Sequence, residues 1–294
     1  MTRELMNTRE IADYLRIKER KVYDLVAKGR IPCTRVTGKW LFPKPLIDRW
    51  LGEHAEGAPA LAAGVDAPPI ITGSHDPLLD WAARESGSSL AVLFNGSLAG
   101  LEHLAAGQAM LCGMHVYDAD SGEYNIPFVR ARLGGEPVVC IEWARREQGL
   151  IVARDNPHGV ESVRDLVRVR FQARQKEAGS HLLLEHLLRE QSLSFEDLRL
   201  ADSPALSESD VAMAVAEGAA DAGLGIAAVA RQHGVGFVSL WQERYDLLVW
   251  RRVYFDPPVQ RLIAFAHSAR FRRRAAELAG YDIAGLGSVH FNGP

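Results

Sequence analysis

The sequence predicts an α/β protein in two parts, a short N-terminal helix-turn-helix segment and a larger body of alternating strands and helices. Apolar residues recur at helical spacing within the first fifty residues, and strands alternate with helices after residue 70. Charge is the third observation. Residues 1–50 carry 12 Lys and Arg against 6 Asp and Glu, whereas the whole chain has a net charge of −3, so a basic head precedes an acidic body.

Length and composition fit two globular domains. The chain has 294 residues, of which 47% are hydrophobic and 24% charged, a balance typical of globular proteins. Its three cysteines are scattered and odd in number, which argues against a disulfide framework and favours a reducing, cytoplasmic compartment. We expect neither a membrane span nor a secretory signal, because no apolar run has the required length or position.

Two short helices with a tight turn between them are expected in the head. Asn7 or Thr8 can cap the first helix, and apolar residues follow at helical spacing. The second helix is expected over 18–27, and Gly29 ends it in the manner of a C-cap glycine. This pair has the pattern of a helix-turn-helix.

A wing and a closing helix are expected after Gly29. Residues 31–36 and 40–42 have the composition of two short strands, and the turn between them contains Gly38. A helix over 45–51 then completes a domain that spans residues 1–51.

Basic side chains on the second helix and the wing are candidate contacts to double-stranded DNA. The second helix of a helix-turn-helix enters the major groove, and a wing contacts phosphate or the minor groove. The alternative interpretation is a solvated polar face without a partner. The candidates are Lys18, Arg20, Lys21, Lys28, Arg35 and Lys39.

Three motifs of the head match a known module. They are the opening T-x-E-x-A-x-Y-L, the centre V-Y-x-L-x-x-x-G-x-I-P and the wing motif G-x-W-x-F, and together they cover nearly its whole length. The head therefore resembles the excisionase-type, MerR-like winged-helix family, which implies a DNA-binding winged helix-turn-helix. The sequence departs from many relatives at Asp24, where they have a basic or neutral residue.

A linker and an α/β body follow the head. Residues 52–69 are rich in Ala, Gly and Pro and lack an apolar period, as linkers do. The body over 70–294 predicts a parallel sheet with helices on both faces. The expected strands are 70–72, 90–94 and 110–116, and the expected helices are 77–85 and 99–106.

A Gly-Ser pair recurs three times where an expected strand meets a helix. Ligands bind at the carboxyl ends of strands in open α/β sheets, and the free N–H groups of helix N-termini attract anions. Three such turns would suit a small oxyanion, although all three serines could also be ordinary helix caps. The pairs are Gly73-Ser74, Gly96-Ser97 and Gly179-Ser180.

Other candidate sites have weaker patterns. Cys112 and His115 have C-x-x-H spacing without a second pair, so a buried strand is a better interpretation than a metal site. Arg145 and Arg146 are flanked by acidic residues, which favours a solvated face. The sequence has no P-loop, no nucleophile elbow and no clustered catalytic set, so we expect a protein that is not an enzyme and needs no cofactor.

Several motifs of the body match a second known domain. They include Gly113-Met114-His115, the segment 214–226 and the segment 243–247. In this order they resemble the type II periplasmic-binding-protein-like domain of bacterial helix-turn-helix regulators and some molybdopterin-biosynthesis proteins. The resemblance implies two lobes joined by crossing segments near 150–158 and 240–250, with a ligand in the cleft between them.

Relatives of this architecture include molybdate- and tungstate-binding proteins, which hold the oxyanion with hydroxyl groups and backbone amides. The resemblance implies that Ser74 and Ser97 bind ligand from the first lobe and Gly179-Ser180 from the second. Tyr245, in the last motif, completes the candidate ligand-binding set. Where related regulators have N-R-x-x-G-S-G-T-R, residues 173–181 read A-R-Q-K-E-A-G-S-H and lack the Thr-Arg pair.

These observations predict a one-component transcription regulator. A small oxyanion, molybdate or tungstate first, would act as its effector and alter DNA binding by a homodimer. Three alternatives remain open: a sensor of a larger anionic metabolite such as a molybdopterin-type compound, an enzyme or accessory protein of molybdenum-cofactor metabolism, and an architectural DNA-binding protein whose body only dimerises.

Overall fold

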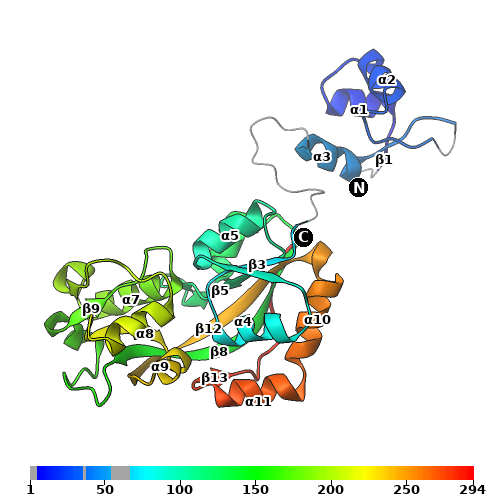
Figure 1. Ribbon diagram of the computed structural model, residues 1–294. Helices are drawn as coiled ribbons and strands as arrows, with labels where there is room; N and C mark the ends of the chain where they lie inside the picture. The colour runs from blue at the N-terminus through cyan, green and yellow to red at the C-terminus, as the bar shows by residue number, and fades with distance from the viewer. Residues whose placement is uncertain (1–4, 36–37, 54–66) are drawn as a thin grey trace. The chain divides into compact units, whose positions relative to one another are not determined.

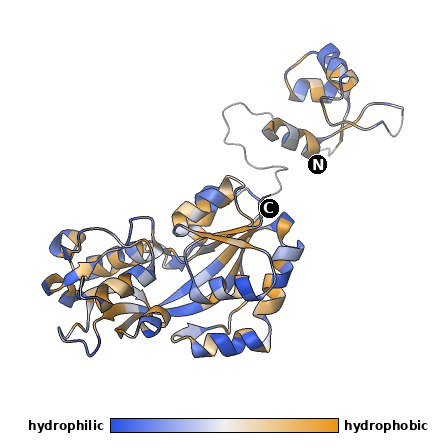
Figure 2. Cartoon of the chain, in the orientation of Figure 1, coloured by the Kyte–Doolittle hydropathy of each residue, from blue (hydrophilic) through white to orange (hydrophobic). Residues whose placement is uncertain are grey.

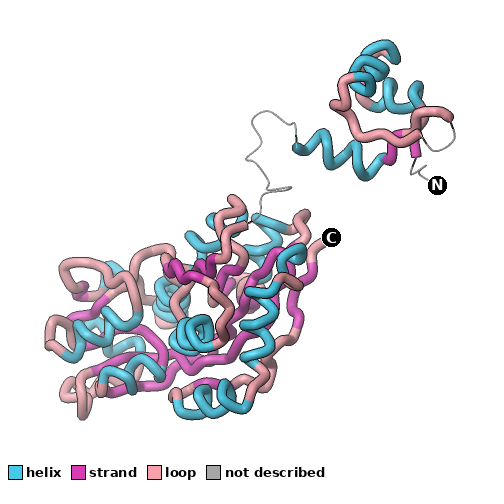
Figure 3. Tube along the Cα trace, turned by 45° about the vertical axis from the view of Figure 1, so that its right-hand side comes forward, coloured by secondary structure: helices cyan, strands magenta, loops and turns pink. Residues whose placement is uncertain are grey.

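The computed structural model describes residues 5–35, 38–53 and 67–294, and the chain divides into two compact units, Met1–Val65 and Asp66–Pro294 (Figures 1 and 3). Most of the expected linker lies outside the described residues. Each unit has its own buried apolar core. None of the helices in the described ranges has the length and apolarity that a membrane span requires.

The first unit has the helix-turn-helix that the sequence predicts. Asn7 caps the first helix: its side chain accepts from the N–H groups of Arg9 and Glu10, and the Glu10 carboxylate accepts from the Asn7 N–H in return. Gly29, with a φ of +62°, follows the second helix. The elements are β1 (Leu5–Met6), α1 (Thr8–Tyr14), α2 (Glu19–Ala27), β2 (Phe42–Pro43) and α3 (Lys44–Glu53).

The wing is shorter than the sequence predicts. A single antiparallel bridge joins Thr34 to Leu41, and residues 36–37 of the expected hairpin lie outside the described residues. β2 instead pairs with β1, which brings Phe42 onto the core of this unit. The buried apolar side chains of that core are Met6, Ile11, Ala12, Val22, Ile31, Phe42 and Ile47.

A ten-stranded sheet organises the second unit. Its order is β10-β9-β11-β8-β12-β5-β3-β4, and β13 and β14 pair with β8. The strands are β3 (Ile70–Gly73), β4 (Ala91–Phe94), β5 (Leu111–Met114), β8 (Val138–Val152), β9 (Arg170–Gln172), β10 (Arg199–Leu200), β11 (Ala222–Ile226), β12 (Gly236–Trp250), β13 (Tyr281–Asp282) and β14 (Val289–Asn292). A separate pair contains β6 (Tyr117–Asp118) and β7 (Glu123–Tyr124).

Helices pack around this sheet (Figure 1). Figure 2 shows α11 as largely hydrophilic, and its apolar residues Phe271 and Ala275 are buried, as expected for an amphipathic helix on a core. The helices are α4 (Pro77–Glu85), α5 (Ser97–Ala105), α6 (Ile126–Leu133), α7 (Gly179–Glu190), α8 (Glu208–Ala216), α9 (Ala227–His233), α10 (Pro257–Ala266) and α11 (Ala269–Glu277). Short 3₁₀ helices lie at Val163–Arg168, Phe195–Asp197 and Arg251–Val253.

The sheet is mixed, which corrects the prediction of a parallel one. β3 pairs in parallel with β4 and β5, but β12 runs antiparallel to both β5 and β8. The reason is that β8 and β12, with 15 residues each, are long antiparallel partners that extend through the whole sheet. The shorter strands on either side are parallel to one another, and β5 and β11 pair with end segments of β12 and β8.

Two lobes share the long strands. The first lobe packs its core on Val138–Ala144 and Tyr245–Trp250, and the second packs on the residues after Gly149. The chain therefore crosses between the lobes near residues 145–148 and 241–244. The second crossing lies within the range expected from the sequence, whereas the first precedes the expected 150–158. Register irregularities flank the second crossing, at Ser239/Trp241 and Tyr245/Asp246.

Candidate functional site

All six basic candidates of the head are exposed. On α2, Asp24 forms ion pairs with Lys28 at 2.9 Å and Lys21 at 3.6 Å, and the hydrogen bond from Lys28 lowers the pKa of the Asp24 carboxyl. The Arg35 guanidinium stacks 5.2 Å from the Trp40 ring centre. The side chains of this exposed set are Lys18, Arg20, Lys21, Lys28, Arg35 and Lys39.

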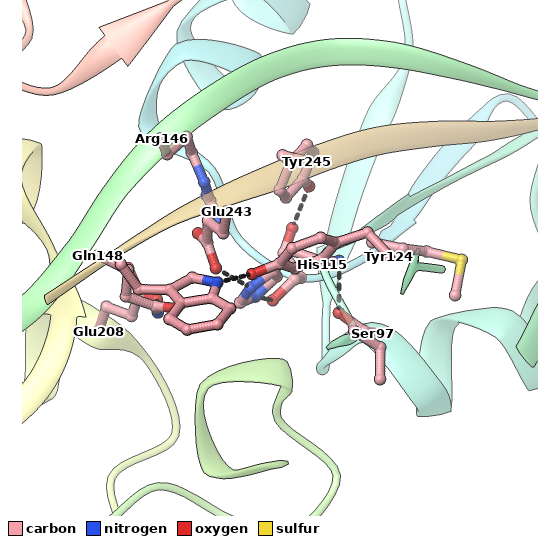
Figure 4. Close-up of polar contacts among 12 residues, drawn as sticks. Ser97, His115, Tyr124, Arg146, Gln148, Glu208, Glu243 and Tyr245 are labelled. Carbon is pink, nitrogen blue, oxygen red and sulfur yellow. Dashed lines mark hydrogen bonds and ion pairs between the residues drawn. The ribbon is translucent and has the colours of Figure 1, made fainter. Parts of the chain in front are cut away.

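The serine candidates of the first lobe meet at His115. Ser74 Oγ lies 2.8 Å from His115 Nε2, and the His115 backbone N–H donates to Ser97 Oγ at 3.2 Å (Figure 4). Both serines are buried, as is the imidazole. Ser74 follows β3, Ser97 begins α5, and His115 follows β5, so three loops at one edge of the sheet place these groups together.

The second lobe reaches the same histidine through Gly179. A Cβ atom at Gly179 would lie 2.6 Å from the His115 carbonyl oxygen and 3.1 Å from its ring, so only glycine fits. The lobes also approach at Gly96, where a Cβ atom would lie 3.3 Å from the Glu177 carbonyl oxygen. The turns at Ser74, Ser97 and Gly179 therefore lie around one residue, His115.

Tyr245 supports this cluster from the long strand β12. Its hydroxyl donates to the Ser74 carbonyl oxygen, and its ring stacks on the His115 ring with centres 5.9 Å apart. Burial raises the pKa of Tyr245, so the phenol stays a neutral donor. A Cβ atom at Gly113 would overlap the Tyr245 hydroxyl.

A buried ion-pair network adjoins the cluster. Arg146 is only 1% exposed and pairs with Asp76 at 3.0 Å and with Glu243, and Glu243 accepts from His115 Nδ1 at 2.8 Å. Burial favours the neutral acid at Glu243, but Arg146 and His115 outweigh it and lower the pKa of that carboxyl. Tyr281 of β13 also donates to Asp76.

The interpretation of Arg145 and Arg146 as a solvated pair is wrong for Arg146. Successive residues of a strand point to opposite faces, so Arg145 is half exposed while Arg146 points inward. Its partners Asp76 and Glu243 are 70 and 97 residues away in the sequence. Strand alternation could have indicated that one of the two arginines is buried, but not which partners it meets.

Polar groups of the second lobe lie beside this network. Gln148 follows Arg146 on the same face of β8, and its Nε2 donates to Glu208 Oε1 at 3.4 Å (Figure 4). Gln148 Oε1 and Ser180 Oγ are both buried, and neither has a hydrogen-bond partner among the described residues. Sequence reasoning missed Gln148 and Glu208.

The described residues show no group of three His, Cys, Asp or Glu side chains that could hold a metal ion. Cys112 is buried on β5, and burial raises the pKa of its thiol. Both ring nitrogens of His115 are already engaged, by Ser74 and Glu243.

The site provides directed N–H groups and hydroxyls at two helix N-termini. The residues before α5 and α7, Gly96 and Ala178, form no side-chain cap, which leaves the first N–H groups of each helix for another acceptor. An aromatic cavity of about 260 Å³ lies close by at the crossing strands. Its lining includes Tyr117, Tyr124, Trp241, Arg145 and Arg244.

Fold and site together define a helix-turn-helix protein with a two-lobed binding domain. Residues 5–55 match the family model described as a helix-turn-helix domain, and residues 80–267 match the one described as a PBP superfamily domain. The second match covers more than half of the chain, which therefore belongs to the PBP superfamily, that of the periplasmic-binding-protein fold.

A curated relative has the same extent as this chain. It is an uncharacterized protein, YvgK, of Bacillus subtilis (strain 168), 26% identical over 296 residues, with 95% of this chain and 96% of the relative covered.

Solved structures with a similar fold include a phosphate transport receptor from Vibrio cholerae, with 15% identity, a TM-score of 0.45 and coverage of 72% of this chain and 98% of the other. A Prochlorococcus marinus protein in complex with methylphosphonate has 11% identity, a TM-score of 0.48 and coverage of 74% and 92%. An ancestral arginine-binding protein has 14% identity, a TM-score of 0.46 and coverage of 72% and 97%.

Proposed function

We propose that this chain is a DNA-binding transcription regulator whose second unit senses a small ligand held between its lobes. The observation that carries the proposal is the convergence at His115 of Ser74 and Ser97 from one lobe and Gly179 from the other. Ligands of two-lobed binding proteins commonly bind where both lobes contribute, because closure around the ligand then couples binding to a conformational change.

The part of the ligand at this position is an oxyanion, with molybdate or tungstate the first candidates. Uncapped N–H groups of α5 and α7 and the Ser180 hydroxyl supply donors, and helix N-termini supply positive potential. Arg146 adds little to this potential, because Asp76 and Glu243 already neutralise it. A larger anionic metabolite, such as a molybdopterin-type compound, is the second candidate, since such a ligand could extend toward the aromatic cavity.

The regulator would act in the cytoplasm as a homodimer, since paired helix-turn-helix heads bind paired half-sites. Coupling between the two sites must be reciprocal. If the ligand changes the affinity for DNA by some factor, DNA changes the affinity for the ligand by the same factor. A role as an accessory protein of molybdenum-cofactor metabolism would show no such coupling.

The test is a DNA-binding titration of the full chain against the promoter region of its own gene, with and without molybdate, tungstate, sulfate or phosphate. We expect one oxyanion to change the affinity and to raise the melting temperature in a concentration-dependent way. The Ser74→Ala/Ser97→Ala double variant should fold and bind DNA but no longer respond. DNA binding by the unaltered chain that none of the four oxyanions changes would reject an inorganic oxyanion as the effector.

A further inference from the structure

Glu208 differs from the other buried carboxylates in forming no ion pair within 4 Å, although the guanidinium groups of Arg174 and Arg146 lie within electrostatic range. Among the buried carboxylates of the described residues, Asp76, Glu142, Glu243 and Asp246 each form an ion pair with Arg or His within 4 Å. Glu208 is 4% exposed, and its one hydrogen bond is the long contact from Gln148. A buried carboxylate without a hydrogen-bonded cation is costly, so it needs an explanation.

Two neutral groups of the same region are also unsatisfied. Gln148 is fully buried, and its amide nitrogen points at Glu208 while its Oε1 has no partner. The amide cannot simply be reversed, because Oε1 would then face the carboxylate. The Ser180 hydroxyl, next to the uncapped start of α7, has no partner either. The region therefore offers acceptors at Glu208 and Gln148 and donors at α7.

The balance of buried charge decides between two kinds of ligand. Asp76 and Glu243 share the single guanidinium of Arg146. The other nearby buried arginine, Arg174, donates to Gln175 and to the backbone carbonyl groups of Ala205 and Leu206 rather than to Glu208. Asp76, Glu243 and Glu208 carry three negative charges against the two guanidinium groups of Arg146 and Arg174. A bare dianion would add to this negative excess, whereas a ligand with its own cation would not.

We propose that the ligand of this site is a small zwitterion, whose cationic nitrogen donates to the Glu208 carboxylate and to Gln148 Oε1 while its oxyanion binds at the N-termini of α5 and α7. The inference rests on the proposed function for the position of the site and specifies the chemical class. An ammonium group supplies the donors that Glu208 and Gln148 Oε1 lack, and the oxyanion accepts from Ser180 and the free N–H groups.

Calorimetry of the full chain tests this class directly. The probes are the twenty common L-amino acids, taurine and phosphoethanolamine, which together present carboxylate, sulfonate and phosphate beside an ammonium group. Each amino acid that binds is compared with its α-hydroxy acid, for example L-alanine with L-lactate, which keeps the oxyanion and removes the cation. We expect the hydroxy acid to bind about 10- to 100-fold more weakly.

Glu208→Gln should weaken zwitterion binding by a similar factor while melting no lower than the unaltered chain, because it removes an unpaired buried charge. Glu217→Gln, an exposed carboxyl at the end of the same helix, is the matched control and should bind normally. A large loss of melting temperature in ligand-free Glu208→Gln would instead assign Glu208 a structural role and overturn the proposal.

Other outcomes separate this inference from the proposed function. Molybdate binding that Ser74→Ala/Ser97→Ala removes and Glu208→Gln leaves unchanged would keep the oxyanion sensor and overturn the zwitterion. Equal affinity for an amino acid and its hydroxy acid would also overturn it. No response to any zwitterionic probe would overturn it, whatever the DNA-binding titrations show for the oxyanions.

Discussion

Gly179 is where the second lobe lies against His115, and the space allows no side chain. Its missing Cβ would lie within 3.1 Å of three His115 atoms. The sequence predicted Gly179 as part of a ligand-binding turn, on the basis of the following serine and the helix. The structure adds a packing role that no local pattern reveals, because the histidine is 64 residues earlier in the chain.

Gly179→Ala is therefore expected to destabilise the chain by about 1–3 kcal/mol, the usual cost of overpacking a tight contact. Gly135→Ala is the control, because nothing lies within 4 Å of the Cβ it would add. Urea unfolding of the two variants and the unaltered chain measures the difference. Equal stability of both variants would mean that the lobes do not meet at His115.

Substitution of Lys21 and of Lys39 tests the predicted contacts to DNA one charge at a time. Both are exposed, and Lys21 also lies 3.6 Å from Asp24. If each contacts a phosphate, Lys21→Ala and Lys39→Ala should each weaken binding similarly on all sequences and lower the salt slope by about one unit. Fluorescence anisotropy at several salt concentrations checks this. Unchanged affinity in both variants would indicate a merely solvated face.

At the scale of elements, local signals predicted the short helices and strands well. α4 begins and ends where the sequence predicts, because Asp76 caps it and Pro77 occupies its first turn. The long strand β8 was not predicted, because a charged stretch, Glu142 to Gln148, interrupts its apolar pattern. Those charges are tolerated because partners from distant segments, such as Asp76 and Glu243, neutralise Arg146.

Removal of Arg146 should be costly at neutral pH and less so in acid. Arg146→Met leaves Asp76 buried without a cation and Glu243 with His115 as its only partner, a loss of about 3–5 kcal/mol. In the unaltered chain the pKa of the Glu243 carboxyl is below its ordinary value of 4.5. Its pairing therefore contributes stability above pH 4.5, and this contribution is lost as the pH falls. In the variant the buried carboxyls can take up protons, so the difference in unfolding free energy should shrink from pH 7 to pH 4.5.

Arg145→Met, at the half-exposed neighbouring position, is the control and should change stability little at either pH. Urea titrations at the two pH values measure both variants. A pH-independent loss in Arg146→Met would mean that the arginine acts through packing rather than through its two carboxylate partners.

At the scale of the whole molecule, charge is divided between the two units. The basic excess of the first fifty residues lies on a unit with its own buried core, which includes Ile11, Val22, Phe42 and Ile47. Composition and spacing were enough to predict this division. They could not locate the crossing near residues 145–148, because the path of β8 depends on its pairing with β12 and β11.

Residues 1–53 alone are expected to bind DNA, more weakly than the full chain and with an affinity that falls steeply with salt. The reason is that counterion release by basic side chains supplies most of the affinity, whereas the second half-site of the proposed homodimer would be lost. Gel-shift titrations of the fragment and the full chain measure this. Absence of binding at low salt would show that the head needs the body to recognise DNA.

The sharing of Glu243 between Arg146 and His115 limits how this family can diverge. Replacement of Glu243 alone would leave Arg146 under-neutralised and the His115 imidazole without its acceptor, so we expect that single change to be disfavoured. Substitutions at Arg146, His115 and Glu243 should therefore arise together over evolutionary time. Arg145, one residue away, is half exposed and pairs with Glu142 instead, so we expect it to vary independently of this network. Joint replacement of these three residues among related sequences would therefore show that the network constrained them during evolution.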